Sequence, residues 1–110
     1  MLSSEQYTCQ NSRGSEAVGY TFEWDTRKAQ SNARKHGVTF DEAKSCFHDP
    51  WQVAFYDPDH SGDEDRELLI GHSNQGRLLL VSYTLRNDLI RIISARKVTK
   101  SEETQYAQGI

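Results

Sequence analysis

The sequence feature that most constrains the fold is a run of four apolar residues, Leu78-Leu79-Leu80-Val81, in a chain that is otherwise hydrophilic. The mean hydropathy of the 110 residues is -0.78, and only 35% of them are hydrophobic. Side chains of a strand point alternately to its two faces, so a strand that is apolar at every position must be covered on both. The run therefore predicts a central strand of a sheet.

Further strands are expected around this run, because apolar and β-branched segments alternate with turn signals. The turn signals are Asn74-Gln75-Gly76 and Arg86-Asn87-Asp88. A short strand over 20–24 is expected to come first in the chain. The four later strands are expected over 51–56, 68–72, 78–83 and 89–96.

A first helix is predicted over 26–36. Asp25 is a suitable N-cap, and Gly37 is well placed for the left-handed residue that ends a helix. The inward face of this helix carries small residues with an asparagine beside them, which allows a close approach to the sheet. These residues are Ala29, Ala33 and Asn32.

Two more helices are predicted from capping boxes, in which a Thr hydroxyl and a Glu carboxylate three residues later satisfy each other's backbone N–H groups. Thr39 and Glu42 open the second helix, and Thr99 and Glu102 open a terminal helix that runs through Tyr106. The second helix has an apolar stripe at helical spacing, which predicts core positions. The stripe consists of Phe40, Ala43, Cys46 and Phe47.

The expected order of elements is therefore β-α-α-β-β-β-β-α, which is an α+β fold with a mostly antiparallel sheet and helices packed on one face. A chain of 110 residues has room for one domain. Residues 1–18 are rich in Ser, Gln, Gly, Asn and Glu without an apolar period, so we expect a disordered leader. The domain is expected to span 19–110.

Composition excludes several classes of protein. No segment approaches the roughly 18 consecutive apolar residues of a membrane span, and no signal-peptide pattern opens the chain. Cys9 and Cys46 lack the spacing of a redox motif, and two free thiols are typical of a reducing compartment. We therefore expect a cytoplasmic protein that does not bind membranes.

The net charge of -3 hides a segregated pattern. Residues 26–37 hold four basic and no acidic residues, residues 38–67 hold nine acidic and two basic ones, and residues 68–100 hold six basic and one acidic. If the two basic segments meet in space, they form a positive face that the net charge does not reveal. Separately solvated charges are the alternative, and charge alone does not decide between them.

Arginines in the last predicted strand are the first candidates for a functional site. Arg91 and Arg96 stand in an otherwise apolar strand, and a guanidinium binds phosphate through two parallel hydrogen bonds. In a regular strand the two would point to opposite faces, so a bulge near Ser94-Ala95 is needed to bring them into one site. The alternative is that each arginine pairs with an acid of the loop over 57–67 or extends to solvent at a sheet edge.

For the other candidate residues, a purely structural role is also possible. His36 follows Lys35 at a helix C-terminus, where the helix dipole stabilises a charged imidazole; it could act in proton transfer or simply cap the helix. Trp24 and Trp51 could stack on bases, although core packing is the expected role of a lone tryptophan.

Motifs for cofactors are missing from the sequence. The acidic stretch that begins at Asp57 has the spacing of a calcium loop, but Leu68 stands where the bidentate glutamate is needed. There is no phosphate-binding glycine loop, no His/Cys metal cluster and no serine-hydrolase motif. We therefore expect neither a metal ion nor an organic cofactor.

Taken together, short segments in a fixed order resemble the BrnT family of type II toxin–antitoxin toxins over about residues 20–106. Each segment alone is weak, but their order is specific. The matching segments are Phe22-Glu23-Trp24-Asp25, Asn32 with Lys35-His36-Gly37, Phe47-His48-Asp49-Pro50, Asp57-Pro58-Asp59-His60-Ser61, Arg66 with Gly71, and Arg91 through Lys97.

The resemblance implies a RelE-like ribonuclease that cleaves RNA without a metal ion, inhibits translation and is neutralised by a BrnA-type antitoxin. It also implies that promoter DNA is bound only through the antitoxin complex. For such a reaction, which needs cations for the phosphate and groups that move protons, we assign Arg66, Arg91 and Arg96 to the phosphate and His36 with Lys35 to proton transfer or substrate anchoring. Lys35, Lys97 and Trp24 are assigned to substrate binding.

Two departures from the family pattern bear on activity. Leu85 stands where the family often has an acidic residue, and Glu103 with Thr104 stand where it usually has arginines. The weaker positive charge of the last helix leaves an alternative function open. In this alternative the protein is a catalytically inactive, toxin-like subunit that binds RNA or serves as antitoxin partner and co-repressor.

Overall fold

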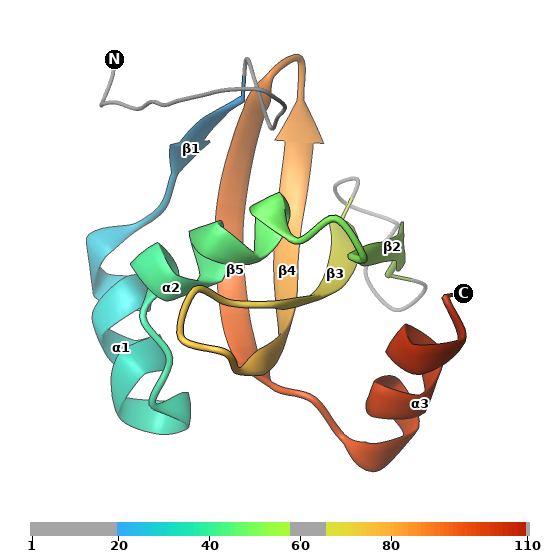
Figure 1. The fold of residues 1–110 in the computed structure, drawn as a ribbon. Coiled ribbons are helices and arrows are strands. Elements are labelled where there is room, and N and C mark those ends of the chain that lie inside the picture. Colours follow the sequence, from blue (N-terminus) through green and yellow to red (C-terminus); the bar gives the residue numbers. More distant parts are fainter. Residues whose placement is uncertain (1–19, 58–65, 110) are drawn as a thin grey trace.

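A five-stranded sheet forms the centre of the molecule in the computed structural model, which describes residues 20–57 and 66–109. Its order is β1-β5-β4-β3-β2, with β1 parallel to β5 and every other pair antiparallel (Figure 1). The strands are β1 (Thr21–Glu23), β2 (Val53–Tyr56), β3 (Arg66–His72), β4 (Leu78–Arg86) and β5 (Leu89–Lys97). The predicted α+β class and mostly antiparallel sheet are confirmed.

Strand β4 lies in the middle of the sheet and is covered on both faces. Leu79 and Val81 are fully buried on one face, and Leu80 on the other face is only 7% exposed. The apolar run therefore forms the central strand that its pattern predicts.

The helices are α1 (Thr26–His36), α2 (Phe40–Ser45), the 3-10 turn η1 (Cys46–His48) and α3 (Lys100–Gln108). Helices α1 and α2 lie on one side of the sheet, and α3 lies at its far end beyond β2 and β3 (Figure 1). The order of helices and strands agrees with the predicted order, with η1 as a short continuation of α2.

Both ends of α1 are where the sequence places them. The Asp25 carboxylate accepts hydrogen bonds from the backbone N–H groups of Arg27 and Lys28, at 2.8 and 3.1 Å. Gly37 ends the helix with φ of +69°, a left-handed conformation that a residue without Cβ adopts at little cost.

The capping box predicted for the second helix is only half formed. Thr39 caps it by accepting a bond from the Glu42 N–H at 3.1 Å, but the Glu42 carboxylate does not return to Thr39. It is buried and binds Arg77, with the Arg77 Nε donating at 2.8 Å and Nη2 donating as well, while Ser73 Oγ donates at 2.7 Å. A buried carboxylate needs a charged partner, and this requirement outweighs a second capping bond.

The core lies between the sheet and the first two helices. Its aromatic rings meet edge to face, with Phe47 5.1 Å from Phe22 and 5.0 Å from Tyr83 between centroids. The predicted stripe of α2 and η1 is buried here (Phe40, Ala43, Cys46 and Phe47). Burial raises the pKa of the Cys46 thiol to about 12. Trp51, by contrast, is 75% exposed, so the expectation of core packing is wrong for this tryptophan.

Asn32 connects α1 to β5. Strand β1 pairs with β5 only as far as Arg91, so the outer edge of β5 has no strand beside Ala95 among the described residues. The buried Asn32 amide fills this place: Nδ2 donates to the Ala95 carbonyl at 2.8 Å, and Oδ1 accepts from the Ala95 N–H at 3.1 Å. Nδ2 also donates to the Val38 carbonyl at 3.0 Å. One side chain thus supplies the hydrogen bonds that a neighbouring strand would provide.

Helix α3 is attached at the end of β3 by Tyr106. Its hydroxyl donates to Asp49 Oδ2 at 2.7 Å and lies 3.0 Å from Nδ1 of His72. Burial raises the pKa of the Asp49 carboxyl, but N–H groups of His72 and Trp51 and the Tyr106 hydroxyl outweigh it, and the net pKa is lowered. The capping box of Thr99 with Glu102, predicted from sequence, is present at the start of α3.

The expected leader over 1–18 and Cys9 lie outside the described residues. Within the described part of the chain, no helix has both the length and the apolar character that crossing a bilayer requires.

Replacing Asn32 by alanine is expected to lower the free energy of unfolding by about 2–4 kcal/mol, because backbone groups at Ala95 and Val38 lose their partners while buried. Urea unfolding followed by circular dichroism measures the change. The control is Ser31→Ala at the exposed neighbouring position, where a change within about 0.5 kcal/mol is expected. Equal stability of the two variants would contradict the role given to Asn32.

The Glu42–Arg77 pair is expected to make stability pH-dependent. The hydrogen bond from Arg77 lowers the pKa of Glu42 below its ordinary 4.5, against the opposing effect of burial. The unfolded chain then binds the proton more readily, so this contribution is complete above about pH 4.5 and is lost as pH falls through the folded pKa. Urea midpoints of wild type and Glu42→Gln should differ by a constant amount above this pH and converge below it. A difference that persists unchanged in acid would contradict the assignment.

A candidate active site on the open face of the sheet

A β-bulge in β5 decides which way its arginines point. The register against β4 shifts by one residue, with Ser82 paired to Ser94 but Tyr83 paired to Ile92. Ile93 is therefore an extra residue in β5. Such a residue shifts the alternation of side chains by one position.

Because of the bulge, Arg91 and Arg96 lie on the same face of the sheet, opposite the face on which Ala95 enters the core. The bulge predicted near Ser94-Ala95 is found at the adjacent Ile93. Without it, Arg96 would take the inward orientation of Ala95, and an unpaired arginine in the core is costly.

Arg66 lies on this same face, which we call the arginine face: the side of the sheet opposite α1 and α2 that carries Arg66, Arg91 and Arg96. Strand pairing joins Arg66 to Thr84 and Thr84 to Arg91, and Arg91 is paired in turn with Glu23 of β1. These four residues form the cross-strand row. At a strand spacing of about 4.8 Å, the two arginines of the row are about 10 Å apart at their Cα atoms.

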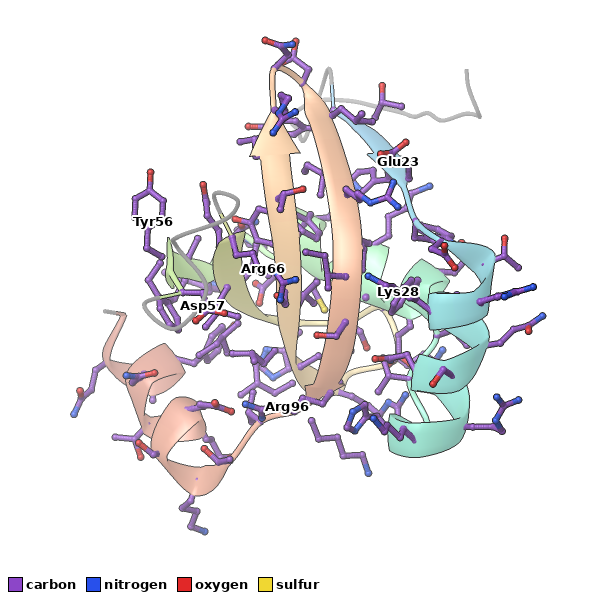
Figure 2. All side chains as sticks on the ribbon, turned by 180° about the vertical axis from the view of Figure 1, so that it is seen from behind. Glu23, Lys28, Tyr56, Asp57, Arg66 and Arg96 are labelled. Atoms are coloured by element: carbon purple, nitrogen blue, oxygen red, sulfur yellow. The ribbon has the colours of Figure 1, made fainter. Side chains whose placement is uncertain are left out.

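Figure 2 shows the molecule from the side of the arginine face. Arg66 lies over the middle of the sheet, Glu23 lies on β1 at the upper edge, and Arg96 lies at the lower end next to α3. Asp57 lies close to Arg66, and its backbone N–H donates to the Arg66 carbonyl at 3.1 Å.

Arg91 and Arg96 each form an ion pair with a glutamate. Arg91 Nη1 donates to Glu23 Oε2 at 2.9 Å, and both side chains are nearly half exposed. Arg96 binds Glu102 of α3 through two parallel bonds of 2.9 and 2.8 Å. The hydrogen bonds from Arg96 lower the pKa of the Glu102 carboxyl.

In the described part of the chain, the acids in these two pairs are Glu23 and Glu102. Most acids of the loop over 57–67, the partners named in the alternative, lie outside the described residues. A guanidinium has five N–H donors. Within the described residues, Arg91 makes one such bond and Arg96 makes three, one of these to the Lys97 carbonyl. Donors remain on both side chains for a phosphate.

The remaining predicted site residues lie elsewhere. Lys35 and His36 are exposed in the last turn of α1, and Lys97 is exposed at the end of β5, paired with Leu79 on the helix-covered side. Helix α1 begins just after β1 and rises about 1.5 Å per residue, so His36 lies about 15 Å along the helix from the cross-strand row. The two basic segments do meet, because α1 packs along β5.

Trp24 is partly buried and packs edge to face on Phe40, with 5.9 Å between centroids. This contact places Trp24 at the core, which is the alternative that the sequence offered for it. The position gives no support to a role in base stacking.

Glu23 is the residue of the site that sequence reasoning missed. It belongs to the motif Phe22-Glu23-Trp24-Asp25, but its partner Arg91 is 68 positions away. The signal that could have found it is the period of two: Phe22 and Trp24 are apolar, so Glu23 must point to the opposite face of β1. Parallel pairing of β1 with β5 then brings it beside Arg91.

Fold and site together define a class of protein: a small α+β domain whose open sheet face presents arginines suited to bind phosphate. Residues 24–102 match the family described as the ribonuclease toxin, BrnT, of type II toxin-antitoxin systems. The chain therefore belongs to the BrnT family of ribonuclease toxins, which confirms the resemblance seen in its motifs, and toxins of this kind act with an antitoxin protein as partner.

The structure is similar to the crystal structure of the ribonuclease toxin BrnT of Brucella abortus, determined at 1.1 Å resolution. The TM-score is 0.58 and the sequence identity 23%, and the match covers 74% of this chain and 99% of the Brucella chain. At this identity the likeness shows the fold. No curated protein sequence has significant similarity to the chain.

Replacing Glu102 by glutamine is expected to loosen α3, because the charged bonds to Arg96 and the bond to the Thr99 N–H weaken together. Hydrogen exchange of the α3 amides, followed by mass spectrometry, should become about tenfold faster while α1 is unchanged. Glu103→Gln, at an exposed position of the same helix, is the matched control. Identical exchange in the two variants would show that the pair does not hold α3.

Proposed function

We propose that this protein is the toxin of a type II toxin–antitoxin system and an endoribonuclease that cleaves RNA without a metal ion and thereby inhibits translation. A BrnA-type antitoxin neutralises it, and promoter DNA is bound through the complex of the two proteins. The observation that carries the proposal is that Arg66 of β3 and Arg91 and Arg96 of β5 lie on one open face of the sheet.

Cleavage of RNA without a metal ion proceeds by in-line attack of a 2′-OH on the adjacent phosphorus. The negative charge that grows on the phosphate oxygens then has to be stabilised by cations fixed in advance. Arg66 and Arg91 stand on either side of Thr84, and a phosphate above Thr84 is within reach of both long side chains. The cross-strand row is therefore the place for the phosphate that is cleaved.

The lower end of the arginine face is suited to a neighbouring phosphate. Arg96 keeps donors beyond those bound to Glu102. Exposed Lys97 is on the opposite side of the sheet at the end of β5, so its proposed contact is with the RNA backbone beyond the end of the strand. His36 and Lys35 lie far from the cross-strand row along α1. Of the two roles suggested for them, anchoring of the RNA backbone fits their position better than proton transfer.

Alanine at Arg66 or Arg91 is expected to lower the cleavage rate about 10²–10³-fold, the effect of removing one preorganised donor from a developing oxyanion. Alanine at Arg96 should mainly weaken binding of RNA and raise KM. The measurement is cleavage of purified RNA in EDTA by antitoxin-free protein, with product release followed against time.

Arg34→Ala is the control, since it removes one positive charge from an exposed position of α1. Full cleavage activity of Arg66→Ala or Arg91→Ala, with folding unchanged by circular dichroism, would contradict the proposed phosphate site. Growth arrest on expression of the wild type, and its relief by a co-expressed BrnA-type antitoxin, tests the biological part of the proposal.

A second function is favoured by the ion pairs on the arginine face. Arg91 and Arg96 are already neutralised by Glu23 and Glu102, and such pairs are also what a toxin-like subunit without catalysis would contain. A subunit of this kind binds RNA or the antitoxin without turnover. Product formation by protein present well below the RNA concentration distinguishes the enzyme from the binding subunit.

A further inference from the structure

Among the described acids on or next to the arginine face, Glu23 is the one whose carboxylate is open to a substrate. Its side chain is 43% exposed, and of its two oxygens only Oε2 is bonded among the described residues, to Arg91. Two other described acids near this face differ from it. Both oxygens of Glu102 are bound to Arg96, and Asp57 is buried. Oε1 of Glu23 thus keeps lone pairs that can accept a proton.

The position of Glu23 relative to the proposed phosphate follows from the strand register. Arg91 lies between Glu23 on one side and Thr84 on the other. The Cα atom of Glu23 is one strand spacing of about 4.8 Å from that of Arg91 and two spacings, about 10 Å, from that of Thr84. A phosphate held by Arg91 over this row, with its ribose on the β1 side, therefore brings the 2′-OH toward the Glu23 carboxylate. Because the Glu23 carboxylate is bonded to Arg91, the guanidinium that binds the phosphate also fixes the orientation of the carboxylate.

We propose that Glu23 is the general base of the ribonuclease reaction. This inference rests on the proposed function and adds the group that receives the proton. Glu23 takes the proton of the 2′-OH, the 2′-oxygen forms a bond to phosphorus, and the bond from phosphorus to the 5′-oxygen breaks. The leaving 5′-oxygen takes a proton from solvent water. The products are a 2′,3′-cyclic phosphate and a 5′-hydroxyl end.

His36 is the base that the sequence suggests, because an imidazole exchanges protons near neutral pH. It lies at the far end of α1, about 15 Å along the helix from the cross-strand row. A base must come within hydrogen-bond reach of the proton it removes, directly or through one water. The geometry favours Glu23 for a phosphate bound in the cross-strand row.

The test compares wild type, Glu23→Gln and Glu23→Asp on a short oligoribonucleotide that contains a site found first by cleavage of total RNA. Glutamine can still accept a hydrogen bond from Arg91, and circular dichroism with thermal melting checks that β1 stays in place. We expect kcat of Glu23→Gln to fall about 10²–10⁴-fold with KM changed less than about threefold. Asp41→Asn, which removes one negative charge from an exposed position of α2 on the other side of the sheet, should leave kcat unchanged.

The pH profile separates a base from a structural ion pair. The fall of kcat toward acid pH in the wild type should be absent in Glu23→Gln and present, at a lower overall rate, in Glu23→Asp. A 2′-deoxy nucleotide at the cleaved position should abolish cleavage by the wild type.

The outcomes are distinguishable. If the wild type cleaves and Glu23→Gln cleaves at a similar rate, or keeps the acid fall of the wild type, Glu23 is not the base and the phosphate site stands. If the folded wild type leaves all RNA intact at every concentration, the ribonuclease function fails and this inference fails with it. If Glu23→Gln has a much lower kcat, no fall of kcat toward acid pH and an unchanged KM, the assignment is supported.

Discussion

The structure depends on how the backbone N–H and C=O groups at the edge of β5 are hydrogen-bonded beyond the end of β1. A buried backbone without a hydrogen-bond partner costs about as much as a lost hydrogen bond, and the described part of the chain has no further strand to supply one at Ala95. The Asn32 amide binds both polar groups of Ala95 and so fixes α1 against the sheet. With Ala95 held inward just after the bulge, the next residue, Arg96, must point to the opposite face. One amide thereby fixes both the position of a helix and the direction of an arginine.

The charges of the arginine face are partly balanced within the protein itself. Arginines on the same face of a sheet repel each other, and carboxylates from β1 and α3 offset that repulsion at Arg91 and Arg96. Pairs that are this exposed stabilise the fold only modestly. In the proposed reaction, a phosphate would replace part of such a pair at small energetic cost. The net charge of -3 therefore says little about this surface, because acidic and basic residues are unevenly distributed along the sequence.

Much of the fold follows from local patterns in the sequence. Asp25 and Gly37 mark the ends of α1 because capping depends on residues within one turn, and the apolar run marks β4 because burial on two faces leaves no polar position. The site follows less well. The alternation of strand residues predicts that Arg91 and Arg96 need a bulge between them, but the partners of the two arginines come from segments that only the tertiary fold brings close. Glu42 shows the same limit: its local capping position was outweighed by Arg77, 35 residues away.

The parallel pairing of β1 with β5 has a consequence for folding during synthesis. Of the described strands, the one made first on the ribosome pairs with the one made last, with 68 positions from Glu23 to Arg91. Contacts so distant in sequence form late, because the intervening chain has to be ordered first. The arginine face therefore does not exist on a nascent chain whose β5 is still inside the exit tunnel. Any activity that depends on this face can begin only after that strand has left the ribosome that made it.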